Sequence, residues 1–311
     1  MVLKNSYWIT LICLMSAVFV SAQKQGYTEN QLTNGNYDNR YASYNKAGNQ
    51  IIFESNRDGH WQIYVMNING TRQRQLISSK YNDRRPSWHP FKNMILFESD
   101  RKGYSEFYTY NIDTRELKLI PIPIKGNKLY GQFAPNGQEM IFNHKVADKN
   151  YNIYMCNLKG KRLKKLVDNA HANLYPRFSS RGDAFVYFSR KDTQGETDEI
   201  YSYNIILKED QRLTEWPMHN FVPTFSNDRN HIVYAQSMEG NRPEIFIMTV
   251  NGSNKHQITF NENGDTLPNW SPKDINLLIT GERNGNYHIC KILLKEPFEG
   301  TEKPFEVVTK D

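Results

Sequence analysis

Arginine and histidine side chains recur in the polar segments of this chain, and they are its main candidates for chemistry. Guanidinium groups bind carboxylates and phosphates through paired hydrogen bonds, and imidazoles ligate metals or transfer protons near neutral pH. No His-x-His pair and no Gly-x-Ser-x-Gly segment accompanies them, so the pattern favours ligand binding and assigns no catalytic residue. The alternative is that these segments are polar only because they face water. The candidate ligand-binding residues are Arg57, His60, Arg101, His144, His171, Arg190, His219 and Arg283.

The elements that must position these side chains follow from a repeat. An aromatic residue returns every 44 to 47 residues, at Tyr44, Trp88, Phe133, Phe178, Phe225 and Trp270. Between these positions lie short segments rich in aromatic and β-branched residues, bounded by Gly, Pro, Asn or Asp, as is typical of antiparallel strands joined by tight turns. No segment holds a 3.6-residue apolar period. The sequence therefore predicts an all-β fold, a six-bladed β-propeller of four-stranded antiparallel blades, with the six aromatic residues packed between blades.

A propeller of this kind sorts its loops between two faces. The turns between strands one and two and between strands three and four lie on one face, which we call the tight-turn face. The loops between strands two and three and the links between blades lie on the other, which we call the long-loop face. The second set is longer and more charged, and it carries all eight candidate residues. Glu54 and Glu98 share one repeat position, which indicates a structural role for both carboxylates.

The chain start has the layout of a secretory signal peptide. Lys4 precedes an apolar run, and small residues precede Gln23, so we expect cleavage after residue 22 and one propeller domain over residues 23–311. A membrane anchor is the alternative, but the run is short for a span. Two segments compete to close the last blade, residues 30–33 and residues 305–309, and we favour the first because Leu32-Thr33 matches the end of other units.

Charge and cysteine content set further limits. The formal net charge of +6 falls to +5 without Lys4, and acidic and basic residues are interspersed without a basic arm or stripe, so we expect no nucleic-acid partner. Cys156 falls in the third unit and Cys290 in the sixth, too far apart to form a disulfide bond, and both are expected to be free and buried. We expect a monomer without cofactor or bound metal, and without a membrane span after cleavage.

Several segments of the repeat carry a family resemblance, namely residues 86–90, 53–59, 63–67 and 252–259. They resemble the TolB-type propeller repeat, a WD-like repeat of exported bacterial proteins, over about residues 30 to 295. The resemblance implies a periplasmic or secreted protein. TolB itself carries an α/β domain before its propeller, and the stretch from Gln23 to Leu32 is too short for one. The propeller is also similar to that of prolyl oligopeptidase-like enzymes and of oligogalacturonate lyases, but the hydrolase elbow and the histidine cluster of those enzymes find no match here.

Two hypotheses for function follow. The first is an exported, non-enzymatic propeller that recognises an envelope protein partner or an anionic oligosaccharide through its long-loop face. The alternative is a glycan-active enzyme, a polysaccharide lyase or glycoside hydrolase, that acts at the channel mouth with histidine, arginine and carboxylate groups. The absence of a recognisable catalytic motif favours the first hypothesis.

Overall fold

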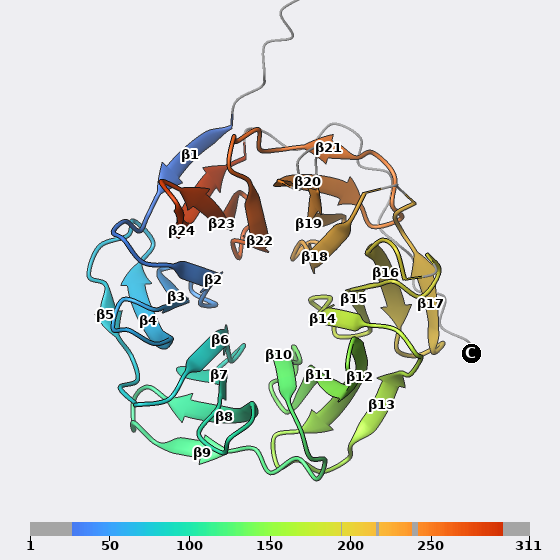
Figure 1. Ribbon diagram of the computed structural model, residues 1–311, viewed down its shortest axis with the longest axis horizontal. Coiled ribbons are helices and arrows are strands. Elements are labelled where there is room, and N and C mark those ends of the chain that lie inside the picture. Colours follow the sequence, from blue (N-terminus) through green and yellow to red (C-terminus); the bar gives the residue numbers. More distant parts are fainter. Residues whose placement is uncertain (1–26, 194, 216–217, 238–241, 295–311) are drawn as a thin grey trace, which may run out of the picture.

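The computed structural model describes residues 27–193, 195–215, 218–237 and 242–294. These residues form six four-stranded antiparallel sheets arranged as blades around a central axis (Figure 1). The six-bladed propeller predicted from the repeat is confirmed. The proposed signal peptide and residues 305–309 lie outside the described residues. No helix in the described part of the chain is long and apolar enough to cross a lipid bilayer.

Each blade runs from an inner strand at the axis to an outer strand at the rim. Blade 1 contains β2 (Asn39–Tyr44), β3 (Gln50–Ser55), β4 (Gln62–Asn67) and β5 (Arg74–Gln75). Blade 2 contains β6 (Asp83–Trp88), β7 (Met94–Ser99), β8 (Glu106–Asn111) and β9 (Leu117–Leu119). Blade 3 contains β10 (Lys128–Phe133), β11 (Glu139–Ala147), β12 (Asn150–Asn157) and β13 (Lys164–Val167).

The second half of the ring repeats this plan. Blade 4 contains β14 (Asn173–Phe178), β15 (Ala184–Ser189), β16 (Glu199–Asn204) and β17 (Glu209–Arg212). Blade 5 contains β18 (Asn220–Phe225), β19 (His231–Ser237), β20 (Pro243–Thr249) and β21 (His256–Gln257). Blade 6 contains β22 (Asp265–Trp270), β23 (Asn276–Arg283) and β24 (Asn286–Leu293), and β1 (Thr28–Gln31) is its outer strand.

The N-terminal strand therefore closes the ring, as favoured from the sequence. Figure 1 shows the blue β1 beside the red β24, and Asn30 is paired with Lys291. Just beyond β1, the Leu32 N–H donates to the Ile289 carbonyl, and the Thr33 hydroxyl oxygen accepts the Ile289 N–H at 2.9 Å. Thr214 makes the same contact with the Ile200 N–H in blade 4. Because the repeat positions match, the chain start supplies the outer strand of the last blade.

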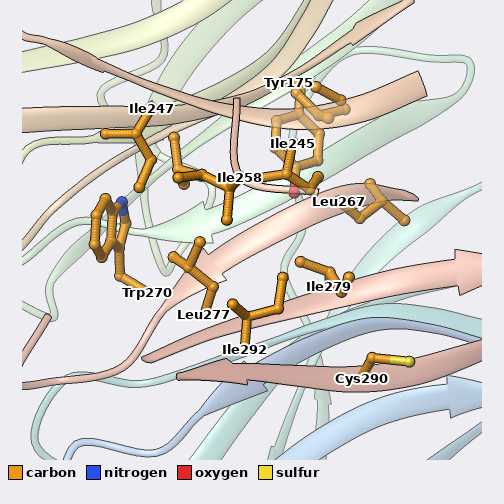
Figure 2. Packing of buried hydrophobic residues seen from close by; sticks show 13 residues of the cluster. Tyr175, Ile245, Ile247, Ile258, Leu267, Trp270, Leu277, Ile279, Cys290 and Ile292 are labelled. Atoms are coloured by element: carbon orange, nitrogen blue, oxygen red, sulfur yellow. The ribbon is translucent and has the colours of Figure 1, made fainter. Parts of the chain in front are cut away.

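Aromatic residues fill the junctions between neighbouring blades, as predicted. The Trp88 and Trp270 indole N–H groups each donate at 3.2 Å to a carbonyl of the preceding blade, those of Ser43 and Thr224. Figure 2 shows Trp270 packed among isoleucine and leucine side chains of blades 5 and 6. Each blade thus buries its faces against its neighbours, which is why no single blade would be stable alone.

The two cysteines are free and buried, as expected from their places in the repeat. Cys156 lies in β12 of blade 3 and Cys290 in β24 of blade 6, on opposite sides of the ring (Figure 1).

Every inner strand carries a bulge at its third residue. The register against the second strand shifts there in all six blades. The residue at the bulge has a φ between 48° and 58°, in the left-handed region that side-chain-bearing residues seldom adopt. The six bulge residues are Tyr41, Arg85, Tyr130, Tyr175, Val222 and Leu267. Because the same unusual backbone recurs in each blade, it belongs to the architecture of the repeat.

Candidate functional site

Three of the predicted arginines share a structural contact inside their blades. Arg57 and Arg101 lie just after the end of a second strand and Arg283 is the last residue of one. Each of the three donates to the first residue of the inner strand of its own blade. Arg101 illustrates the contact, with its Nη2 atom 2.8 Å from Asp83 Oδ1. Its guanidinium also lies 4.6 Å from the centre of the Tyr108 ring. In each of these blades the contact ties the end of the second strand to the start of the inner strand.

The fourth predicted arginine and a predicted histidine meet at one carboxylate. Arg190 Nε lies 2.7 Å from Asp198 Oδ1, and His219 Nδ1 lies 2.9 Å from Asp198 Oδ2. Asp198 lies in the loop before β16, and His219 lies in the link to blade 5. This is the one cluster of predicted site residues that the described structure brings together. The Asp198 carboxylate already neutralises the Arg190 guanidinium within it.

The other predicted histidines lie apart at blade junctions. His60 Nε2 is 2.7 Å from the Ser79 carbonyl, and His144 Nε2 is 2.6 Å from the Lys125 carbonyl. His171 is half-buried in the link to β14. Within the described residues, no three His, Cys, Asp or Glu side chains are grouped so that they could hold a metal ion.

A polar cavity of about 570 Å³ opens on the long-loop face, over blades 1 to 3. Its volume falls in the range of about 300–1,000 Å³ that is usual for small-ligand sites. Its charged side chains are Arg84, Arg85, Glu98 and Asp100, and its aromatic side chains are Trp61 and Tyr104. Amide and hydroxyl side chains complete the wall, namely those of Asn82, Asn127, Ser99 and Ser105. We call this the mouth cavity.

The acidic groups of the mouth cavity are occupied within the protein. Asp100 accepts both the backbone N–H and the side-chain N–H of Asn82. Glu98 Oε2 lies 2.6 Å from Arg85 Nη1, and Glu98 Oε1 accepts the Tyr130 N–H at 2.5 Å. Burial raises the pKa of the Glu98 carboxyl, and Arg85 and the Tyr130 N–H oppose that shift.

Arg84 is the more exposed of the two arginines that line the mouth cavity. Its side chain is 30% exposed, and its Nη2 atom is paired with Glu54 Oε1 at 3.4 Å, which is long for a hydrogen bond. Two guanidinium groups lie over the Trp61 ring, with Arg84 at 4.8 Å from its centre and Arg40 at 5.2 Å. Cation–π contacts of this kind orient a guanidinium and leave its edge free for hydrogen bonds. Within the described residues, the Nε atoms of Arg40 and Arg84 have no hydrogen-bond acceptor.

Sequence reasoning did not single out Arg84, which lines this cavity, or its neighbour Arg40. Arg40 and Arg84 are the second residues of their inner strands, whereas blades 3, 4 and 5 carry Leu129, Leu174 and Phe221 at that position. This difference between blades was the signal in the sequence that could have identified Arg84. A charged residue that only some blades carry at a repeat position is not needed to form a blade.

Comparison with known proteins places the chain in a family. It matches the family model for the TolB beta propeller domain over residues 8–149 and 143–297. The chain therefore belongs to the TolB β-propeller domain family. A search of curated protein sequences gave no match.

Solved structures with the same fold include TolB and an oligogalacturonate lyase. TolB from Acinetobacter baumannii is 19% identical with a TM-score of 0.65, over 83% of this chain and 64% of that one. A putative TolB from Agrobacterium tumefaciens is 13% identical with a TM-score of 0.69, over 85% and 93% of the two chains. An oligogalacturonate lyase in complex with manganese is 15% identical with a TM-score of 0.61, over 88% and 95%. At these identities the similarity concerns the fold, and the chain spans less than two thirds of the first of these proteins.

Proposed function

We propose that this protein is an exported, non-enzymatic binding module that recognises its partner through the long-loop face, at the mouth cavity. The observation that carries the proposal is the state of Arg84. It is a partly exposed guanidinium with a long ion-pair distance, held by Trp61 at the edge of a polar cavity. A periplasmic or secreted location accords with membership of this family.

The ligand class that fits best is an anionic oligosaccharide. Arg84 matches a carboxylate in geometry and charge. The amide and hydroxyl groups of the wall, such as Asn82 and Asn127, match sugar hydroxyls, which both donate and accept hydrogen bonds. An acidic segment of an envelope protein is the other candidate, and it would use the same guanidinium but fewer of the wall groups.

Titration calorimetry with four probes tests this proposal. The probes are trigalacturonate, hexagalacturonate, neutral maltohexaose and a peptide of alternating aspartate and glycine. We expect binding of the two galacturonates, weaker binding of the peptide and none of maltohexaose. Tighter binding of the peptide would replace the glycan with a protein partner, and equal binding of maltohexaose would contradict the role of Arg84.

The same samples address the enzyme alternative. A lyase would remove a proton from the uronate ring and expel the neighbouring sugar, leaving an unsaturated product that absorbs in the ultraviolet. We expect no increase in absorbance and no new reducing ends over a day of incubation with hexagalacturonate, with and without added Mn²⁺. Accumulation of either product would favour the enzyme hypothesis over the binding module.

A further inference from the structure

The central channel is filled by side chains at one level. The six bulge residues, one from each inner strand, stand at this level and come together. Tyr175, Val222 and Leu267 belong to one buried cluster, and Tyr41 and Tyr130 pack against it. The Tyr130 ring lies 5.6 Å from that of Tyr175. The backbone in Figure 1 leaves the axis open, but these side chains occupy it.

We call the six bulge residues the plug, and Arg85 is its one charged member. Its guanidinium carbon lies 4.7 Å from the centre of the Tyr130 ring and 5.4 Å from that of Tyr41. The Glu98 carboxylate holds it there at 2.6 Å. The Arg85 side chain is only 15% exposed, so an ion pair, two rings and burial together fix its position.

The plug separates two cavities. Arg85 and Glu98 line the mouth cavity on the long-loop side. A second cavity of about 160 Å³ is lined by Arg85, Tyr41, Tyr175 and by later residues of the inner strands such as Trp88. Inner strands start at the long-loop face and end at the tight-turn face, so the second cavity lies beyond the plug. Arg85 is thus the wall that the two cavities share.

We propose that the mouth cavity recognises the end of an anionic chain, and that the plug, which includes Arg85, determines this preference. A chain entering from the long-loop face meets the plug and cannot continue along the axis. The walls carry further large side chains, namely Trp61 of blade 1, with the Arg84 guanidinium over its ring, and Tyr104 of blade 2. A terminal sugar fits such a space with its carboxylate on Arg84, whereas an internal segment would have to enter and leave through one opening. This inference rests on the proposed function.

The number of protein molecules bound per chain tests it with the unmodified protein. Trigalacturonate, hexagalacturonate and polygalacturonate are each titrated, and the complexes are weighed by sedimentation. End recognition predicts one protein per chain at all three lengths, with affinities per chain within about threefold of each other. A number that rises in proportion to chain length would overturn end recognition while leaving the proposed binding function standing. No binding of any galacturonate would overturn both.

Discussion

Arg85 Nη1 and Glu98 Oε2 lie 2.6 Å apart, and this buried ion pair connects the centre of the propeller to the wall of its mouth cavity. Arg85 belongs to the inner strand of blade 2, and Glu98 belongs to the second strand. The other Glu98 oxygen accepts the Tyr130 N–H of blade 3. One carboxylate therefore fixes the plug and joins two blades.

Glu98→Ala should destabilise the fold strongly. The substitution leaves the Arg85 guanidinium and the Tyr130 N–H buried without their acceptor, and breaking such a pair costs about 3–5 kcal/mol. Urea unfolding followed by tryptophan fluorescence measures the loss. The matched control is Glu116→Ala, because Glu116 is exposed on the rim and its removal should change the free energy of unfolding by less than about 0.5 kcal/mol. Equal effects of the two substitutions would show that Glu98 does not join the blades.

Thr33→Val tests ring closure by the N-terminal strand. Valine keeps the shape of threonine but cannot accept the Ile289 N–H, so we expect a loss of about 1–3 kcal/mol. Thr214→Val removes the same contact inside blade 4, where the covalent chain is continuous, and also the hydrogen bond from its hydroxyl to the buried Glu199 carboxylate, so it should cost at least as much. Thermal melts of both variants make the comparison. A normal melting temperature for Thr33→Val beside a lowered one for Thr214→Val would contradict closure by β1.

Trp270→Phe should be tolerated at a small cost. The indole N–H that donates to the Thr224 carbonyl is lost, which predicts a destabilisation of about 1–2 kcal/mol without a change of fold. Phe133 and Phe178 already occupy the same repeat position in blades 3 and 4. Urea midpoints measure the change, and circular dichroism monitors the fold. A loss of the strand signal would mean that the position needs more than an aromatic ring.

Glu244 predicts a dependence of stability on pH. Burial raises the pKa of this carboxyl to about 7, Asp265 adds to the rise, and the Thr259 hydroxyl, Asn261 and Arg283 oppose it. The folded protein thus binds a proton here that the unfolded chain, with its ordinary glutamate pKa, releases at lower pH. The group therefore costs stability as pH rises from about 4.5 to 7, and the cost persists above that range.

Glu244→Gln should remove this cost. The variant should match the wild type near pH 5 and exceed it near pH 8, by up to about 3 kcal/mol in the free energy of unfolding. Thermal melts at the two pH values give the difference. Equal differences at both pH values would show that Glu244 does not titrate in this range.

The repeat predicted the fold because its parts are local. Short strands, turn residues and the aromatic interval follow from neighbouring residues, and the match of Leu32-Thr33 to other units located the closing strand. The separation of Cys156 and Cys290 followed from blade number alone. These inferences needed the order of units and no knowledge of which side chains meet.

The site was harder to predict because pairing across strands decides which charges are free. Arg101 lies on the long-loop face as expected, but its guanidinium is paired with Asp83, eighteen residues earlier in the chain. Arg84 was not predicted because it lies within a strand. The bulge at the next residue changes the register between β6 and β7, and the pattern of apolar residues does not indicate this bulge. Comparison of repeat positions could have distinguished Arg101 from Arg84. Arg57 and Arg283 make the same contact as Arg101, whereas blades 3 to 5 carry no charged residue at the position of Arg84.

The affinity of Arg84→Ala for hexagalacturonate tests the central claim most directly. Arg181→Ala is the matched control, because Arg181 is exposed in the turn between β14 and β15 on the tight-turn face and its removal changes the net charge equally. A charge-assisted contact is worth about 1.5–3 kcal/mol, so calorimetry should show a loss of affinity of roughly tenfold to a hundredfold for Arg84→Ala and less than about twofold for Arg181→Ala. Equal affinities of the two variants would contradict a ligand site at the mouth cavity.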